Sequence, residues 1–233
     1  MNEGSQRSPA VVSNDGDIDA FLEAVRTAPP ATRGRGRLLF ALDATMSREG
    51  TWDQAAAVQA DLFREAGRVG GLSVQLMWFR GVGEFQVCPW TAEPANLVRE
   101  MTAVRCRAGL TQISRALSHA AVEHERVPVA AMVYAGDACE EPADPLVAQA
   151  GVLGMQGLRL FMFQEGHDPV AADVFQAVAK VSGGAYARFG PGSAATLRAL
   201  LQATAVYAAG GLRALQAHER RTGEKVFRLS APR

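Results

Sequence analysis

The 233-residue sequence has few lysines, few cysteines and no net charge. Its 24 basic residues balance 24 acidic ones, and the only lysines are Lys180 and Lys225. This balance argues against a general nucleic-acid or acidic-lipid binder, because both depend on an excess of basic residues. No apolar run approaches the ~20 residues that a membrane span needs. The polar residues 1–6 have no apolar segment after them that would indicate a signal peptide.

The three cysteines, Cys88, Cys106 and Cys139, are odd in number and widely spaced, with no Cys-x-x-Cys pair. This pattern favours free thiols over disulfides, a zinc site or redox chemistry. We therefore expect a cytoplasmic protein. The composition, 48% hydrophobic and 21% charged, is typical of a globular chain that can bury a core without disulfides.

The pattern along the chain predicts three regions. Residues 1–36 are expected to contain a disordered tail, a short amphipathic helix over 17–27 that packs outside the core, and a linker rich in Pro, Gly and Arg. Residues 37–209 are expected to form the folded domain. Residues 210–233 are expected to form an arginine-rich helix and a tail.

Strands and helices alternate through the central region. The unbroken apolar runs 38–42 and 129–134 are typical of strands that are buried on both faces. The turn at 80–83 predicts a hairpin, which makes 84–88 an antiparallel edge strand. Further strands are expected at 72–79, 158–163 and 185–189, and helices at 52–66, 93–104, 111–125, 144–155, 169–181 and 193–208. The sequence thus predicts an α/β fold: a Rossmann-like, doubly wound, mostly parallel sheet with helices on both faces.

Oxygen-bearing side chains follow the two apolar strands. Asp43, Thr45 and Ser47 come after 38–42, Asp137 comes after 129–134, and Thr111 opens the helix between them. Carboxyl ends of neighbouring parallel strands meet at one edge of a sheet, where ligands bind. Two carboxylates and three hydroxyls are the hard oxygen donors that suit Mg²⁺. The alternative for Thr111 is that it caps its own helix.

These residues also carry a family resemblance. Asp43-x-Thr45-x-Ser47, Gly109-Leu110-Thr111 and then Asp137 resemble the metal-ion-dependent adhesion site (MIDAS) of von Willebrand factor A (VWA) domains. The resemblance covers residues 36–208 and is to the cytoplasmic bacterial type. The one ligand that departs from the pattern is Thr45, which stands where Ser is usual and adds a methyl group while keeping the hydroxyl.

The resemblance implies adhesion and not turnover. A Mg²⁺ or Mn²⁺ ion would be held by Asp43, Thr45, Ser47, Thr111 and Asp137, and the Glu or Asp side chain of a protein partner would complete its coordination. Proteins of this type work beside AAA+ ATPases or in assembly complexes, so such partners are implied. We expect no nucleic-acid or membrane partner.

Two other functions fit parts of the same pattern. A magnesium-dependent phosphohydrolase of the haloacid-dehalogenase type would use Asp43 as nucleophile, with Asp137 and the pair Glu140-Glu141 as its acidic loop. Against it, Thr45 replaces the usual second acid, and no lysine occurs before Lys180. The other alternative is a metal-free scaffold. The acidic pair itself either steers cations or starts the next helix.

Overall fold

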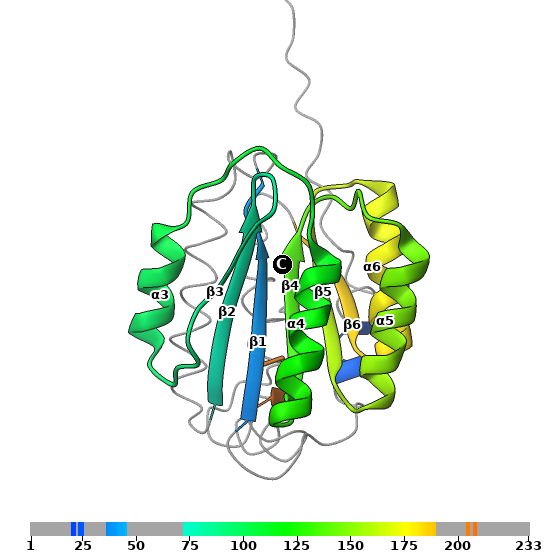
Figure 1. Cartoon of the computed structure of the whole chain (residues 1–233). Helices are drawn as coiled ribbons and strands as arrows, with labels where there is room; N and C mark the ends of the chain where they lie inside the picture. Colours follow the sequence, from blue (N-terminus) through cyan, green and yellow to red (C-terminus); the bar gives the residue numbers. More distant parts are fainter. Residues whose placement is uncertain are drawn as a thin grey trace, which may run out of the picture.

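The computed structural model describes residues 20–21, 23–25, 36–45, 72–189, 204–205 and 207–208. Within these parts six strands form one sheet in the order β3-β2-β1-β4-β5-β6 (Figure 1). Only the β2–β3 pair is antiparallel, and the other four pairs are parallel. This confirms the predicted sheet and its antiparallel edge strand. The strands are β1 (Gly36–Asp43), β2 (Leu72–Arg80), β3 (Glu84–Val87), β4 (Ala131–Gly136), β5 (Arg159–Glu165) and β6 (Ala185–Phe189).

The two central strands, β1 and β4, lie where the order of the sheet reverses. From β1 the chain continues to β2 on one side, and from β4 it continues to β5 on the other. Leu42 near the end of β1 is paired with Ala135 near the end of β4. The segments that follow these strands therefore diverge, and the edge between them is the position where open parallel sheets bind ligands.

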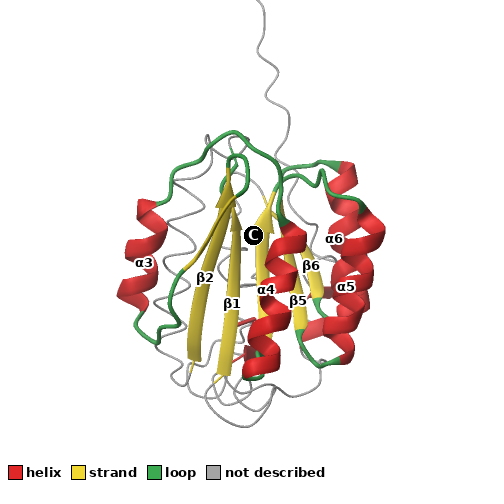
Figure 2. Cartoon of the chain, in the orientation of Figure 1, coloured by secondary structure: helices red, strands yellow, loops and turns green. Residues whose placement is uncertain are grey.

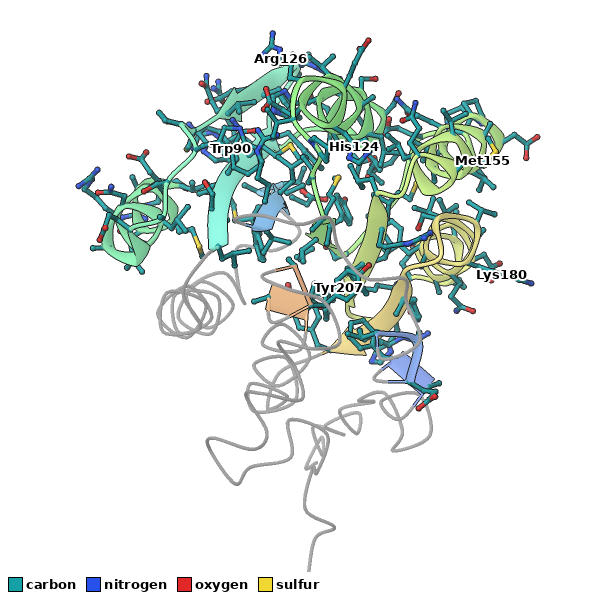
Figure 3. The ribbon with its side chains drawn as sticks, turned by 90° about the horizontal axis from the view of Figure 1, so that it is seen from below. Trp90, His124, Arg126, Met155, Lys180 and Tyr207 are labelled. Carbon is teal, nitrogen blue, oxygen red and sulfur yellow. The ribbon has the colours of Figure 1, made fainter. Side chains whose placement is uncertain are left out.

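Helices cover both faces of the sheet, as the sequence predicts. The helices α4 (Ile113–Arg126), α5 (Ala143–Met155) and α6 (Pro169–Ser182) lie on one face (Figure 3). Their apolar sides bury alternate strand residues such as Leu39, Met132 and Tyr134. The other face is covered by α3 (Pro94–Ala103) and by the helical residues around Phe21 and Tyr207. In the described part of the chain, no helix combines the length and apolarity that crossing a membrane requires.

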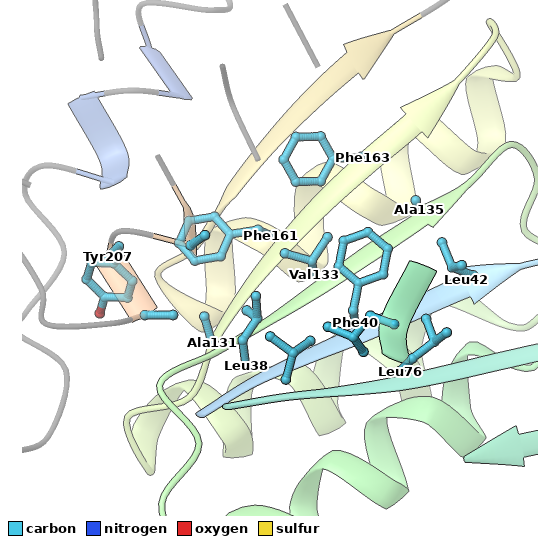
Figure 4. Packing of buried hydrophobic residues seen from close by; sticks show 14 of the residues in the cluster. Leu38, Phe40, Leu42, Leu76, Ala131, Val133, Ala135, Phe161, Phe163 and Tyr207 are labelled. Atoms are coloured by element: carbon cyan, nitrogen blue, oxygen red, sulfur yellow. The ribbon is translucent and has the colours of Figure 1, made fainter. Parts of the chain in front are cut away.

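The N-terminal helix corrects one expectation, because it belongs to the core. Phe21 and Val25 are buried, and the Phe21 ring centroid lies 5.8 Å from that of Phe161 and 5.3 Å from that of Phe163. Figure 4 labels Phe161 and Phe163 among the buried residues of this face. The strand alternation of β5 sends both of these rings to the face that α4, α5 and α6 do not cover. Burying one Phe side chain is worth roughly 1.5–3 kcal/mol, so this apolar surface holds the helix.

Other predicted elements are described only in part. The helix expected at 52–66 lies outside the described residues, and so do the linker before Gly36 and everything after residue 208. The described residues of the helix expected at 193–208, which are 204–205 and 207–208, are helical.

A buried ion pair joins the amino end of β1 to α4. Glu123 on α4 lies 2.7 Å from Arg37 Nη2 and accepts a 2.8 Å hydrogen bond from Trp90 Nε1. The Arg37 guanidinium stacks 3.8 Å from the Trp90 ring centroid, and Arg126 adds a further contact of 3.1 Å to Glu123 (Figure 3 labels Trp90 and Arg126). Burial raises the pKa of Glu123, but the hydrogen bonds from Trp90 and Arg37 outweigh it, so this pKa lies below its ordinary value.

The Glu123 ion pair generates a prediction about stability and pH. A carboxyl group with a lowered folded-state pKa stabilises the fold above its unfolded pKa of ~4.3. That stability is lost as the pH falls through the folded-state pKa. We expect Glu123→Gln to lower the free energy of unfolding at pH 7 by about 2–4 kcal/mol, because it leaves Arg37 buried without its counter-charge. The variant should also lose less stability than the wild type on acidification.

Urea denaturation at pH 7 and at pH 4 measures both effects. Glu125→Gln, an exposed position two residues further along α4, is the matched control and should behave like the wild type. Equal losses in the two variants would show that the ion pair does not stabilise the fold.

Candidate metal centre at the edge of the sheet

Asp43 and Thr45 lie at the carboxyl end of β1. Asp43 is fully buried, and its Oδ1 accepts a 2.8 Å hydrogen bond from the Thr45 backbone N–H. Such a bond from an aspartate to the backbone two residues on closes a tight turn, which fixes the carboxylate relative to the next residues. Thr45 is also buried, and its backbone bridges to Arg107.

The segment that carries Thr111 runs between the end of β1 and the β2–β3 hairpin. Arg107 donates its backbone N–H to the carbonyl oxygen of Ala44 at 3.1 Å. Gly109 lies directly on the backbone of Gly81, where an added Cβ would be 2.0 Å from the Gly81 carbonyl oxygen. Only glycine permits this approach, and it brings Thr111 to the edge at which β1 ends. Figure 2 shows these loops crossing above the strand ends.

Thr111 bonds to the loop after β4 and does not cap its own helix. Its Oγ1 accepts a 3.2 Å hydrogen bond from the Glu140 backbone N–H, and its own N–H donates to Glu140 Oε2 at 3.0 Å. The N-cap of α4 is Gln112, which makes no capping bond with its side chain. The capping alternative for Thr111 is therefore wrong.

The acidic pair does not start the next helix either. The Glu141 carboxylate accepts hydrogen bonds from the backbone N–H groups of Ile113 and Ser114, the latter at 2.9 Å. Helix α5 begins only at Ala143, after Pro142. Glu141 therefore caps the N-terminus of α4, and Glu140 holds Thr111 just before it, tertiary contacts that sequence spacing did not indicate.

Asp137 follows β4 beside the end of β1. Since Leu42 pairs with Ala135, Asp43 and Gly136 follow in register and Asp137 comes one residue later. Asp137 Oδ1 is buried and has no hydrogen-bond partner among the described residues. An unsatisfied buried carboxylate oxygen is costly, and a bound cation would remove that cost.

The structure thus brings four of the five candidate ligands, Asp43, Thr45, Thr111 and Asp137, to one edge of the sheet. Ser47 lies outside the described residues. No group of three or more His, Cys, Asp or Glu in the described part of the chain could hold a metal by itself. An ion here would need hydroxyl oxygens and waters as well, the mixture that Mg²⁺ favours. The donor set fits such an ion, and ion binding by these residues stays a prediction.

Comparisons with known proteins support the fold. No family model matches the chain, and no curated protein sequence matches it. Several solved structures are similar to it. The SpRpn10 VWA domain is 12% identical with a TM-score of 0.57, and the match covers 71% of this chain and 93% of that one. The vWF domain of the type V pili tip protein Mfa5 from Porphyromonas gingivalis is 10% identical with a TM-score of 0.57, covering 75% and 96%.

The pilus adhesin SpaC from Lactobacillus rhamnosus GG is a third similar structure. It is 10% identical with a TM-score of 0.59, and the match covers 76% of this chain and 30% of that larger one. At these identities the likeness is one of fold. The chain therefore has the fold of a VWA domain.

The contact between Gly109 and Gly81 gives a direct test of this site's geometry. Gly109→Ala would push a methyl group into the Gly81 backbone and should destabilise the protein by about 2 kcal/mol or more. Gly151→Ala is the matched control, because nothing lies within 4 Å of the added Cβ in α5. It should be neutral or stabilise the fold by up to about 1 kcal/mol. Thermal or urea denaturation compares the two, and similar effects would contradict the close approach.

Proposed function

We propose that this chain is a metal-dependent protein–protein interaction module. A Mg²⁺ (or Mn²⁺) ion is held by Asp43, Thr45, Ser47, Thr111 and Asp137, and it binds a Glu or Asp side chain of a partner. One observation carries the proposal. The buried Asp137 Oδ1 has no hydrogen-bond partner among the described residues. It lies at the edge of the sheet where Asp43, Thr45 and Thr111 also lie.

Each residue has a distinct part in this proposal. The hydroxyls of Thr45, Ser47 and Thr111 contribute neutral oxygens, and the carboxylates of Asp43 and Asp137 supply the negative charge. Bound there, the ion would offer an open coordination position to an incoming carboxylate. The bond from the Thr45 N–H holds Asp43 in place before any ion arrives.

The surface beside the site suits a partner segment. Leu110, next to Thr111, is 66% exposed, and Val82 at the tip of the hairpin is fully exposed. The contact of Gly109 with Gly81 brings these two apolar residues to the same part of the surface. The exposed Arg107, whose guanidinium lies 3.8 Å from the Glu84 carboxylate, adds positive charge there. Exposed apolar side chains beside a polar site are typical of interaction surfaces, and the arginine favours an acidic partner.

The acidic pair also bears on the choice between binding and catalysis. The carboxylates of Glu140 and Glu141 accept hydrogen bonds from the backbone at the start of α4. A phosphohydrolase would need such acids to hold magnesium at the phosphate, and Thr45 stands where its second acid is usual. The adhesin among the similar structures also favours binding. We therefore propose a binding module in preference to an enzyme.

The cellular setting is part of the same proposal. Cys88 and Cys139 are free thiols, and burial raises the pKa of each to about 11. Thiols that are not paired in disulfides suit a reducing cytoplasm. The partners that we propose there are AAA+ ATPases or assembly complexes that present an acidic side chain.

Removing Asp43 tests the ion site. Asp43→Ala should abolish the binding of Mg²⁺ and Mn²⁺ measured by calorimetry, because it deletes one of the two charged ligands. In EDTA we expect little change in stability, since relief of the repulsion from Asp137 offsets the loss of the hydrogen bond that the Thr45 N–H donates to Asp43. Ca²⁺ should bind the wild type less well than Mg²⁺, because it prefers more oxygens at longer distances. Asp144→Asn, at an exposed position, is the control and should bind as the wild type does. Undiminished binding by Asp43→Ala would refute the site.

The enzyme alternative has its own assay. We expect the wild type with Mg²⁺ to release no phosphate from a generic aryl phosphate. Release of phosphate that disappears in Asp43→Asn would overturn the binding proposal and support the phosphohydrolase.

A further inference from the structure

Glu140 and Glu141 stand three and four residues after Asp137, and both side chains reach back to the start of α4. Between them their carboxylates accept hydrogen bonds from three backbone N–H groups, those of Thr111, Ile113 and Ser114. The first N–H groups of a helix have no partner inside the helix. The loop after β4 therefore provides the N-terminal cap of α4.

The helix has no cap of its own to replace this one. The N-cap residue Gln112 donates its side-chain amide to the carbonyl oxygen of Glu84 at 3.1 Å. Its side-chain oxygen accepts a 2.6 Å hydrogen bond from Arg115. No acidic residue lies in the first turn of α4. Within the described residues, Glu141 is thus the carboxylate that caps the first N–H groups of α4, and Glu140 binds the N–H of Thr111 just before the helix.

The cap also ties together two candidate ligands of the ion. Thr111 precedes α4, Asp137 precedes the acidic pair, and Thr111 and Glu140 exchange two hydrogen bonds. The Glu140 N–H uses one lone pair of Thr111 Oγ1, which fixes the rotamer of that side chain. A hydroxyl oxygen has two lone pairs, so one is left for the ion.

The helix end itself disfavours a cation. The N-terminus of a helix carries about half a positive charge, and Thr111 lies only two residues before Ile113, the first residue of α4. Two carboxylates on this helix end outweigh that partial charge. The electrostatic potential next to Thr111 therefore becomes negative, which favours the binding of a divalent cation there.

We propose that Glu140 and Glu141 are positioning residues of the ion site, and this rests on the proposed function. They act through Thr111 and through the charge at the start of α4, and they do not contact the ion. By fixing the position of the Thr111 hydroxyl relative to Asp137, they set the affinity of the site for Mg²⁺.

The test measures ion affinity in Glu140→Gln, in Glu141→Gln and in the double variant. Titration calorimetry with Mg²⁺ alone and with Mn²⁺ alone gives the dissociation constants. We expect affinities roughly 10–100-fold weaker than in the wild type, the usual effect of removing residues that orient ligands. Asp144→Asn removes the same charge from the exposed first turn of α5. It should change the affinity less than about twofold, because its carboxylate orients no ligand.

A second readout separates positioning from a purely structural role. Melting in EDTA reports the fold without the ion. If the glutamates only stabilise α4, the melting temperature in EDTA falls while the ion affinity of the folded protein stays at the wild-type value. That result would overturn the inference. If the double variant fails to fold, the single variants decide the question. Each single variant keeps the carboxylate of the other glutamate, and the amide oxygen of its new Gln can still accept a hydrogen bond.

The two proposals fail in different ways. A wild type that binds neither ion would refute the proposed function and this inference together. Ion binding that is lost in Asp43→Ala but unchanged in the Gln variants, as in Asp144→Asn, would refute this inference alone.

Discussion

The parallel pairing of β1 with β4 is the contact on which the rest of the site depends. It sets Leu42 beside Ala135, so the residues that follow, Asp43 and Asp137, leave the sheet at the same edge. Both strands are buried on both faces, with Leu39 and Phe40 facing opposite core clusters. A slip of one residue would exchange these faces, so core packing fixes the register and, with it, the separation of the two carboxylates.

Helix α4 is held in place at both ends by charged groups from other parts of the chain. At its N-terminus the carboxylates of Glu140 and Glu141 accept backbone N–H groups. At its C-terminus the Arg37 guanidinium donates to the carbonyl oxygens of Glu123 and Val127 and pairs with the Glu123 side chain. Negative charge at the first end and positive charge at the second both match the helix dipole. The helix is thereby a fixed support for Thr111.

Local sequence patterns predicted most of the fold but only part of the site. Unbroken apolar runs predicted β1 and β4, and the turn around Val82 predicted the hairpin, because each depends on residues close in sequence. The place where Phe21 packs could not be predicted, since an amphipathic pattern shows that a helix docks but not on which surface. The reach of Glu141 to α4 spans 27 residues, and it depends on the register of β1 and β4. The Gly109–Gly81 contact likewise exists only in the folded chain.

The distribution of charge in the proposed site suits the binding of an external carboxylate. In the proposed site two carboxylates, Asp43 and Asp137, balance a divalent ion. The other nearby acids, Glu140 and Glu141, are occupied by the backbone of α4, so they raise the local negative potential without filling a coordination position. Hydroxyl ligands are neutral and leave the ion electrophilic. An ion held in this way keeps a position for an external carboxylate.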